Sequence, residues 1–418
     1  MKLGFAKVNI TPPLGTELAG YAGYRLSAGV HDPLYCKAVF LEQEGVRYAL
    51  IALDLLCVDE ALYYRIAQVL EPLGIAKQRL IVSAIHTHAA PRGVIPGEGP
   101  LAQVNSPSNP NNSAFHGYIQ TVIHAAYAAC EQAVMNLEPF LIRAAQGELP
   151  PVGSERHTGD VPKGNLTVIQ CRTESGKLLT VYNFPCHPTV MSAANLLVSA
   201  DFVGTIEERL GGEMAVFLNG AGGDVSTRFT RRESTFAECA RMGSLAAEQI
   251  KAVIETVPYK HPEPVRGIHA VVTLRARRVE KPEQAQKQYD ELFARWKAAQ
   301  ESGADASTLR MLKSYVEGAG VNLQFAQTMG DITQLHLPVT VFRLFGLNFV
   351  TVPGELFSAL QPEGLAVIGY ANGYYRYFGG EEAYEAGHYE ALAAIIARGE
   401  GERLVNEILK LQKRLNAM

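Results

Sequence analysis

The chain has 418 residues, 47% of them hydrophobic and 19% charged, a balance that fits a packed globular protein and excludes a disordered one. The formal net charge is −4 and there is no basic run, which argues against a nucleic-acid partner. No apolar stretch approaches the roughly 18 residues of a membrane span, and the N-terminus lacks a signal-peptide core, so the predicted location is the cytoplasm. The six cysteines are scattered without paired spacing, and we expect most of them to be reduced core residues.

The first third of the chain mixes patterns of strand and helix length. After an alternating N-terminal segment, apolar runs predict strands at 37–42, 48–53 and 79–83. Helices are predicted at 59–73 and 115–136. Residues 91–114 are rich in proline, asparagine and glycine, and a loop of this length inside a domain is usually functional or mobile.

The rest of the chain continues the mixture. Strands are predicted at 166–172, 178–184, 214–218, 335–345 and 348–352. Helices are predicted at 201–210, 234–256, 358–368 and 385–416. The polar segment 282–327 predicts an exposed helical pair that could serve as a lid. We therefore expect one large α/β domain over residues 1–418, with several layers of mixed β-sheet, flanking helices and a helical insertion at about 282–327.

Two histidines, His86 and His88, follow the strand predicted at 79–83. Residues two apart in an extended backbone point to the same side, so both imidazoles could bind one metal ion. One could equally bind the ion while the other carries protons, or one could simply pack against a turn. Imidazole is the commonest transition-metal ligand, which makes this pair the first candidate site.

A third histidine, His187, ends the strand predicted at 178–184 and lies between Pro185 and Pro188. The prolines would hold a ligand rigidly, although a structural turn explains them equally well. The neighbouring Cys186 could be a nucleophile or a soft ligand, but adjacent strand residues point to opposite sides. His187 is therefore the candidate at this position.

A glycine-rich turn with Gly223, Asp224 and Ser226 follows the strand predicted at 214–218. Such turns can present backbone N–H groups to an anion or oxyanion, and they can also be no more than tight turns. The segment is neither a phosphate-binding P-loop nor the Gly-x-Ser-x-Gly elbow of serine hydrolases.

Two further segments complete the candidates. Glu355 follows a Pro-Gly turn at the end of the strand predicted at 348–352, and tyrosines cluster at Tyr374, Tyr375 and Tyr377. Most of these segments lie at strand ends, where α/β folds collect catalytic groups. Two or three imidazoles with one carboxylate make a catalytic zinc site that leaves a position open for water.

In this order the segments resemble the catalytic domain of the neutral/alkaline non-lysosomal ceramidase family. The resemblance spans roughly residues 3–395. The segments that carry it are Gly20-Tyr21, the stretch 82–91 around His86, Cys186-His187-Pro188, Ser199-Ala200-Asp201, residues 222–226, Pro353-Gly354-Glu355, residues 372–377 and Tyr389-Glu390-Ala391. Each motif is short, but the ordered set is specific.

The resemblance implies one Zn²⁺ ion with four protein ligands, which here are His86, His187, Glu355 and Tyr377. It implies that Ser226 is the nucleophile, with a zinc-activated water as the competing proposal. His88 would carry protons or contact the substrate, and Tyr377 would also stabilise the oxyanion.

The substrate contacts implied by the resemblance are less well matched. Arg156 stands where family members have the arginine of an Asn-Arg-Ser segment, and Gly223 and Asp224 would contribute from the glycine-rich turn. The family's proline after the serine of Gly-Asp-Val-Ser is Thr227 here.

The predicted function is zinc-dependent hydrolysis of a linear amide, with a small soluble N-acyl compound rather than ceramide as the substrate. Ceramide is a membrane lipid, and the sequence shows no amphipathic or lipid-anchoring segment. The alternatives are an esterase or lactonase on the same site, a metal-binding or sugar-binding module without catalysis, and a serine hydrolase that needs no metal.

Overall fold

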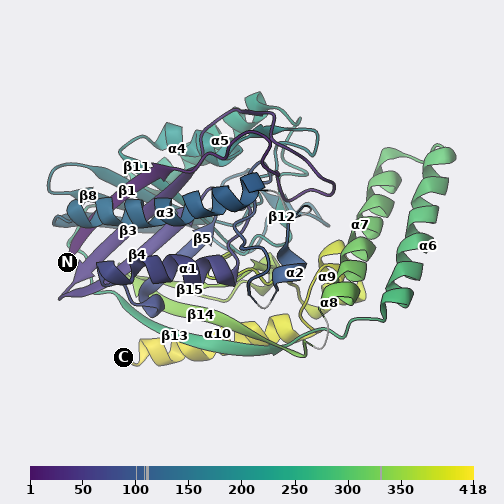
Figure 1. Ribbon diagram of the computed structural model, residues 1–418. Helices are drawn as coiled ribbons and strands as arrows, with labels where there is room; N and C mark the ends of the chain where they lie inside the picture. The colour runs from purple at the N-terminus through teal and green to yellow at the C-terminus, as the bar shows by residue number, and fades with distance from the viewer. Residues whose placement is uncertain (100, 108, 110–112, 330–331) are drawn as a thin grey trace.

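Three four-stranded sheets form the frame of the molecule (Figure 1). The structure is a computed structural model and describes residues 1–99, 101–107, 109, 113–329 and 332–418. In spatial order, the first sheet consists of β1 (Lys2–Asn9), β3 (Tyr35–Gln43), β4 (Val46–Leu53) and β5 (Leu80–Ala84). The second consists of β11 (Met214–Asn219), β9 (Leu178–Phe184), β8 (Leu166–Thr173) and β6 (Phe140–Gly147). The third consists of β13 (Arg266–Arg275), β14 (Gln334–Leu344), β15 (Leu347–Thr351) and β17 (Ala366–Ile368).

Helices cover the sheets from outside. α3 (Ser113–Met135) packs on β1 and β3 and is flanked by α1 (Glu60–Leu70). α5 (Phe236–Ile254) packs on β6 and β8 beside α4 (Phe202–Leu210), and α10 (Glu400–Asn416) packs on β13 and β14. The remaining helices are α2 (Ala102–Asn105), α6 (Pro282–Glu301), α7 (Ala306–Thr328), α8 (Glu381–Glu385) and α9 (Tyr389–Leu392).

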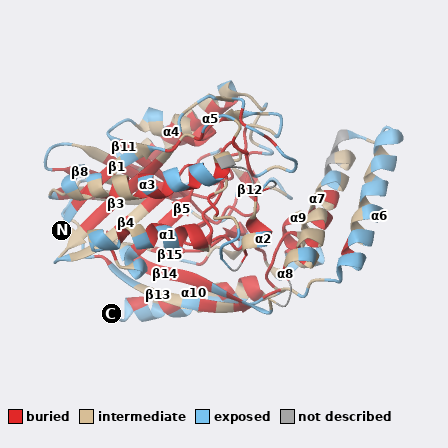
Figure 2. Cartoon of the chain, viewed as in Figure 1, coloured by how far each residue is buried: buried red, intermediate tan, exposed pale blue. Residues whose placement is uncertain are grey.

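The inner faces of the three sheets share one hydrophobic cluster. Leu41 from the first sheet, Ile169 and Val216 from the second, and Phe349 and Ile368 from the third all belong to it, and all are buried. Burial therefore concentrates along the strands, while α6 remains mostly exposed and α7 is partly buried (Figure 2). This packing confirms the predicted multi-layer α/β class with mixed sheets and flanking helices.

Each large sheet contains one parallel pair among antiparallel strands. The pairs are β4 with β5, β9 with β11, and β15 with β17. The carboxyl ends of these strands meet, because Ala84 N donates to the Tyr370 carbonyl and Gly369 N donates to the Asn219 carbonyl. Ligand sites in α/β folds form at such carboxyl ends.

Three two-stranded ribbons connect the segments around this meeting point. β2 (Gly29–Val30) pairs with β10 (Leu197–Val198), β7 (Ser154–Glu155) with β12 (Val225–Ser226), and β16 (Glu355–Leu356) with β18 (Tyr377–Phe378). The last two carry residues singled out in the sequence.

Two predicted helices are wrong. Residues 358–368 form a 3₁₀ turn (Ser358–Leu360) and then β17, because Pro362 and Gly364 interrupt the helix and residues 366–368 pair with β15. Residues 385–416 divide into α9 and α10, and the left-handed Gly399 (φ 81°) lies immediately before α10.

In the three large sheets, β6 and β13 fall in segments where no element was predicted, and the short strands of the three ribbons were not predicted either. β6 and β13 both lie at the edge of their sheets, where one side has no neighbouring strand and the burial pattern is weak. The predicted helical pair is present as α6 and α7, which stand side by side away from the sheets (Figure 1). The predicted loop 91–114 contains α2, and its positions 100, 108 and 110–112 lie outside the described residues.

All six cysteines are buried and free of disulfides, as expected of core residues. Within the described ranges, no helix is long and apolar enough to cross a membrane.

Candidate metal centre

His86 lies two residues beyond the end of β5 and is 2% exposed. Its backbone is left-handed (φ 69°), a conformation that costs a non-glycine residue about 1–3 kcal/mol and is common at functional sites. The Nδ1–H group donates to the Leu56 carbonyl over 2.7 Å. This bond fixes the tautomer and leaves the lone pair on Nε2 facing the interior.

His187 follows β9 and is fully buried. Its Nδ1–H group lies 2.8 Å from the Gly222 carbonyl and 2.9 Å from the Val225 carbonyl. Because Nδ1 faces two carbonyl acceptors, it carries the ring proton, and Nε2 is unprotonated with its lone pair available. Both histidines are therefore oriented by carbonyl groups in the way that metal-ligating histidines usually are.

Glu355 opens β16 and is 1% exposed. Its Oε2 lies 3.1 Å from His187 Nε2 and 3.5 Å from His86 Nε2. Among the residues that the structure describes, neither Glu355 Oε2 nor His187 Nε2 has a hydrogen-bond partner. Two buried lone-pair atoms at 3.1 Å repel one another unless a cation lies with them.

A proton is a poor candidate for that cation. Burial, opposed by Glu355 and helped by the neighbouring His187, lowers the pKa of His86 to about 3. Burial, followed by the positive charge of Arg156, holds the pKa of His187 well below its usual value. Both imidazoles are neutral at ordinary pH, and two neutral imidazoles with one carboxylate fit a zinc ion.

Two tyrosines flank Glu355. The hydroxyl of Tyr374 donates to Glu355 Oε1 over 2.5 Å. Tyr377 is the backbone partner of Glu355 in the parallel β16–β18 pair, which places both side chains on the same side. Burial, followed by the charge of Glu355, holds the pKa of both tyrosines well above the usual value. The sequence singled out Tyr377, whereas the direct bond to Glu355 belongs to Tyr374.

His88 completes a cluster with the other two histidines. The potential ligand atoms of His86, His88 and His187 all lie within 4.8 Å of one another, so the three could hold a metal ion. His88 Nε2 lies 3.4 Å from His86 Nε2, and His88 Nδ1 is buried without a partner.

The loop around residue 20 holds His88 in place. A Cβ atom at Gly20 would lie 2.4 Å from the His88 ring, and Tyr21 meets that ring edge-on at 4.8 Å between centroids. Gly20 also has a φ of 93°, which favours glycine. The Gly20-Tyr21 segment quoted from the sequence therefore forms the packing surface of His88.

The glycine-rich turn makes contacts other than those expected. Gly223 N donates to the Leu356 carbonyl, so this N–H already has a protein acceptor. The Asp224 carboxylate accepts from Ser358 N (2.7 Å) and Ser358 Oγ (3.1 Å), which turns it toward the protein. Burial raises the pKa of Asp224 to about 6 despite these bonds.

Ser226 lies beside His187 through a parallel backbone bridge and is 6% exposed. Its Oγ is 3.4 Å from Arg228 N. Among the described residues, no histidine or carboxylate is hydrogen-bonded to this hydroxyl, although a serine nucleophile needs such a base.

Arg156 follows β7 and faces the centre electrostatically, since its charge acts on all three histidines and on Tyr377. Its Nη1 lies 3.0 Å from Glu390 Oε1. Burial opposes the charged form, but Tyr377 and Glu390 raise the pKa of Arg156 above its usual value. The buried cation is therefore fixed beside the site.

Asn219 ends β11 and was not among the candidate residues identified in the sequence. Its side-chain Nδ2 donates to the carbonyls of Ile85 and Cys186, and its Oδ1 accepts from Cys186 N. One amide thus joins the residues immediately before His86 and His187. A buried asparagine at a strand end before a glycine-rich turn was the available signal.

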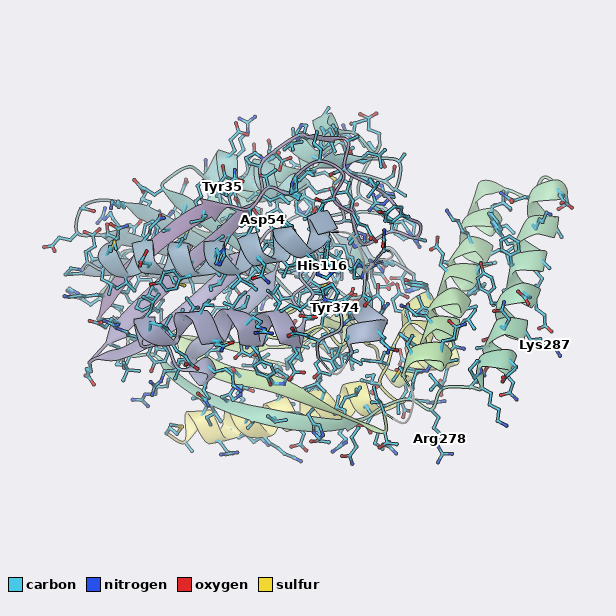
Figure 3. The ribbon with its side chains drawn as sticks, in the orientation of Figure 1. Tyr35, Asp54, His116, Arg278, Lys287 and Tyr374 are labelled. Atoms are coloured by element: carbon cyan, nitrogen blue, oxygen red, sulfur yellow. The ribbon has the colours of Figure 1, made fainter. Side chains whose placement is uncertain are left out.

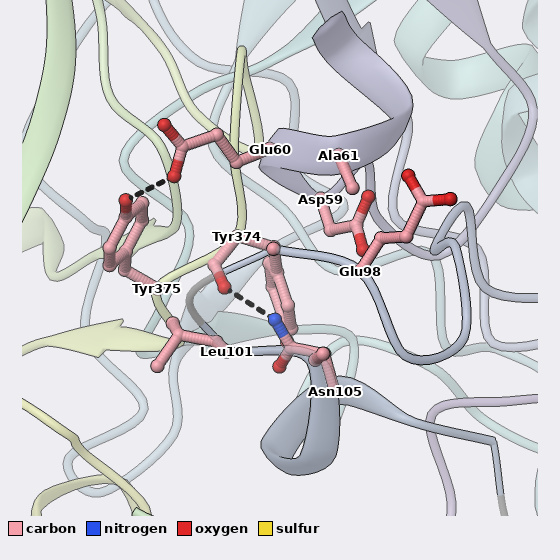
Figure 4. A pocket seen from close by; sticks show the side chains of 10 residues that line it. Asp59, Glu60, Ala61, Glu98, Leu101, Asn105, Tyr374 and Tyr375 are labelled. Atoms are coloured by element: carbon pink, nitrogen blue, oxygen red, sulfur yellow. Dashed lines mark hydrogen bonds between the residues drawn. The ribbon is translucent and has the colours of Figure 1, made fainter. Parts of the chain in front are cut away.

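A small cavity of about 10 Å³ adjoins the centre, with room for one water molecule (Figure 4). Tyr374 contributes to its wall and accepts a hydrogen bond from Asn105 Nδ2 at its backbone carbonyl. The hydroxyl of Tyr375 donates to Glu60 on the same wall. Tyr374 lies in the interior of the molecule, while Lys287 and Arg278 lie at its periphery (Figure 3).

Comparisons with known proteins place this geometry in context. The sequence model described as neutral/alkaline non-lysosomal ceramidase, N-terminal, matches residues 1–263. The crystal structure of a neutral ceramidase from Pseudomonas aeruginosa matches with a TM-score of 0.72 and 16% identity, covering 98% of this chain and 73% of that one. A structure described as a ceramidase complexed with C2 matches with a TM-score of 0.71 and 16% identity, covering 99% and 75%. A search of curated proteins found no match. At this identity the solved structures show a shared fold, which extends over the part of the chain that carries Glu355.

Proposed function

Because this chain belongs to the neutral/alkaline non-lysosomal ceramidase family, we propose that it is a zinc-dependent hydrolase that cleaves the linear amide bond of an N-acyl compound. The family membership confirms the resemblance found in the sequence. The observation that carries the proposal is the 3.1 Å approach of two bare acceptors, His187 Nε2 and Glu355 Oε2. We further propose a small soluble N-acyl substrate in preference to ceramide, consistent with a centre of buried polar side chains.

His86, His187 and Glu355 would hold the ion, with Tyr377 as the fourth ligand. A zinc ion at such a site supplies Lewis acidity toward a carbonyl oxygen and makes water nucleophilic at neutral pH. Leu56, Gly222 and Val225 orient the two imidazoles through their carbonyls, so the ligands need little rearrangement on binding.

His88 is the residue best placed to move a proton. Burial, followed by the charges of its histidine neighbours, keeps its pKa well below the usual value. A neutral imidazole can accept a proton and pass it to the leaving nitrogen. Gly20 and Tyr21 hold the ring, so His88 is ready for this role without a change of rotamer.

Arg156 and Tyr377 would stabilise negative charge that develops on the substrate oxygen. Arg156 is a largely buried cation, 13% exposed, that pairs with Glu390, and donors that are fixed before the reaction stabilise a transition state most. Ser226 remains a candidate nucleophile, but the contacts of its hydroxyl favour water in that role.

The experiment is a panel of N-acyl amides of different acyl length, including a short-chain ceramide, with matched esters and a lactone. Amide turnover that a zinc chelator abolishes and zinc restores supports the proposal. Faster ester or lactone turnover would indicate the esterase alternative. Turnover that survives chelation would indicate a serine hydrolase, and ligand binding without turnover would indicate a non-catalytic module.

Two variants assign the residues. His187→Ala should lose the zinc and at least about 10³-fold in kcat/KM, since metal catalysis contributes several kcal/mol to the transition state. Ser226→Ala should keep near-normal turnover. His261→Ala, at an exposed histidine, is the matched control. Full zinc retention in His187→Ala would remove His187 from the site.

A further inference from the structure

Tyr370 is a fully buried residue beside the candidate metal centre, two residues beyond the end of β17. Its backbone N–H donates to the Gly354 carbonyl, which lies one residue before Glu355. Its own carbonyl accepts from Ala84 N, two residues before His86. The main chain of Tyr370 is therefore bonded to the segments that carry two of the three candidate ligands.

The side chain of Tyr370 packs against both ligand histidines. Its ring stacks on the His86 ring, with 4.1 Å between centroids and 24° between the ring planes. It also meets the His187 ring edge-on, at 6.3 Å and 90°. Among the described residues, the Tyr370 hydroxyl has no hydrogen-bond partner. The contacts of this side chain with the histidines are therefore made by its ring.

His86 needs a second constraint that His187 already has. The Nδ1–H group of His187 faces two carbonyl acceptors, whereas that of His86 has the Leu56 carbonyl alone. A single hydrogen bond sets the direction of the N–H group but leaves the tilt of the ring about that bond free within the range of the side-chain torsions. The stack with Tyr370 opposes this tilt, which would move His86 Nε2 away from the centre.

The backbone of both stacked residues is left-handed, with φ 69° at His86 and φ 54° at Tyr370. This conformation is unfavourable for residues other than glycine and persists where surrounding contacts hold it. Such residues cluster at functional sites. Two of them in direct ring contact indicate that the relative position of these rings is maintained against a conformational cost.

We propose that Tyr370 is a positioning residue whose ring holds the His86 imidazole in the orientation that binds zinc. This inference rests on the zinc centre of the proposed function. A metal ion on Nε2 draws electrons from the imidazole, and an electron-poor ring is attracted to the electron-rich face of a tyrosine. The stack should therefore be stronger with the ion bound, so loss of the Tyr370 ring weakens zinc binding.

The test is the zinc dissociation constant of the full chain, measured by competition with a chromophoric chelator. Tyr370→Leu keeps an apolar side chain but removes the ring, and should weaken zinc binding about 10–100-fold, as for other groups that orient metal ligands. Tyr370→Phe keeps the ring and should bind zinc as wild type does. With Co²⁺ in place of zinc, the d–d absorption bands should change in Tyr370→Leu and return to the wild-type pattern in Tyr370→Phe.

Tyr182→Leu is the matched control for loss of packing. Tyr182 lies on β9 and is also a fully buried tyrosine, but its ring contacts are with Phe184 and Phe217. In urea denaturation Tyr182→Leu should lose stability as Tyr370→Leu does, because both substitutions leave a cavity. Its zinc affinity should nevertheless be that of wild type.

Wild-type zinc affinity in Tyr370→Leu, or an equal loss of affinity in Tyr182→Leu, would overturn the proposal. So would an equal loss in Tyr370→Phe and Tyr370→Leu, since the hydroxyl rather than the ring would then matter. The proposed function fails separately. Zinc binding that depends on the Tyr370 ring, without turnover of any N-acyl amide, would support the positioning role and contradict the proposed reaction.

Discussion

The candidate metal centre and the α6–α7 hairpin are built by opposite means. His86, His187 and Glu355 are at most 2% exposed and follow strands of the three large sheets, and carbonyls from other segments orient the two histidines. In the hairpin, α6 is largely exposed and α7 is half-buried, and ion pairs lie one helical turn apart, such as Lys287 with Glu291 at 4.0 Å. Long-range contacts thus make a rigid centre, while local contacts suffice for the projecting helices.

The largest difference in stability should appear when a charge buried in the first sheet is removed. Lys37 is fully buried, lies 2.8 Å from Asp54 Oδ1 and also pairs with Glu207. Lys37→Met would leave the buried Asp54 carboxylate and the mostly buried Glu207 carboxylate without a cation, at a cost of about 3–5 kcal/mol in the free energy of unfolding. Urea denaturation measures this free energy, and Lys297→Met, at an exposed lysine on α6, is the control. Equal losses in both variants would contradict the comparison.

The second-largest loss of stability should come from Asn219→Ala. It removes three buried hydrogen bonds that join the segments of His86 and His187, each worth roughly 1 kcal/mol, so about 3 kcal/mol of stability is lost. Zinc affinity should fall about 10–100-fold, as for other groups that support metal ligands. Asn219→Asp keeps the acceptor and the size of the side chain but loses the donor. Its zinc affinity should lie between those of wild type and Asn219→Ala. Unchanged zinc affinity in Asn219→Ala would show that the histidines do not need this amide.

Acid should lower the stability of the fold through Glu390, which pairs with Arg156 beside the centre. Burial alone would raise the pKa of Glu390, but the hydrogen bond from His157 and the charge of Arg156 outweigh it and lower the pKa to about 2. Because the folded pKa lies below the unfolded value, the ionised carboxylate stabilises the fold above about pH 4.5. About 3 kcal/mol is then lost as the pH falls from 4.5 to 2. Glu390→Gln should flatten the dependence of unfolding free energy on pH in that window, and an unaltered slope would exclude Glu390 as its source.

The smallest change in stability should come from a substitution on the exposed surface of the hairpin. Lys287 is 79% exposed, and exposed pairs at this spacing contribute about 0.5 kcal/mol or less. Lys287→Ala should leave both the unfolding free energy and amide turnover within error of wild type. A clear loss of turnover would mean that the hairpin takes part in the reaction, as a lid would.

The same contrast explains what the sequence could predict. The hairpin and most strands of the three large sheets follow from local periodicity, and the α/β class follows from their mixture. The helix predicted at 358–368 failed because pairing with β15 outweighed local preference. The division of 385–416 depends on a left-handed glycine whose conformation the sequence pattern did not reveal.

The centre was less accessible to prediction. Spacing marked His86 and His88, but the carbonyls that orient His86 and His187 belong to loops that only the tertiary fold brings near. The grouping of His86, His187 and Glu355 came from the family resemblance, and the contacts of Tyr374 and Asn219 came from the structure.

Zinc-edge anomalous diffraction from crystals grown with zinc would test the central claim most directly. We predict a peak within bonding distance of His86 Nε2, His187 Nε2 and Glu355 Oε2, with His88 outside the coordination sphere. A peak bound by the three histidines without Glu355, or no peak among these residues, would contradict the account.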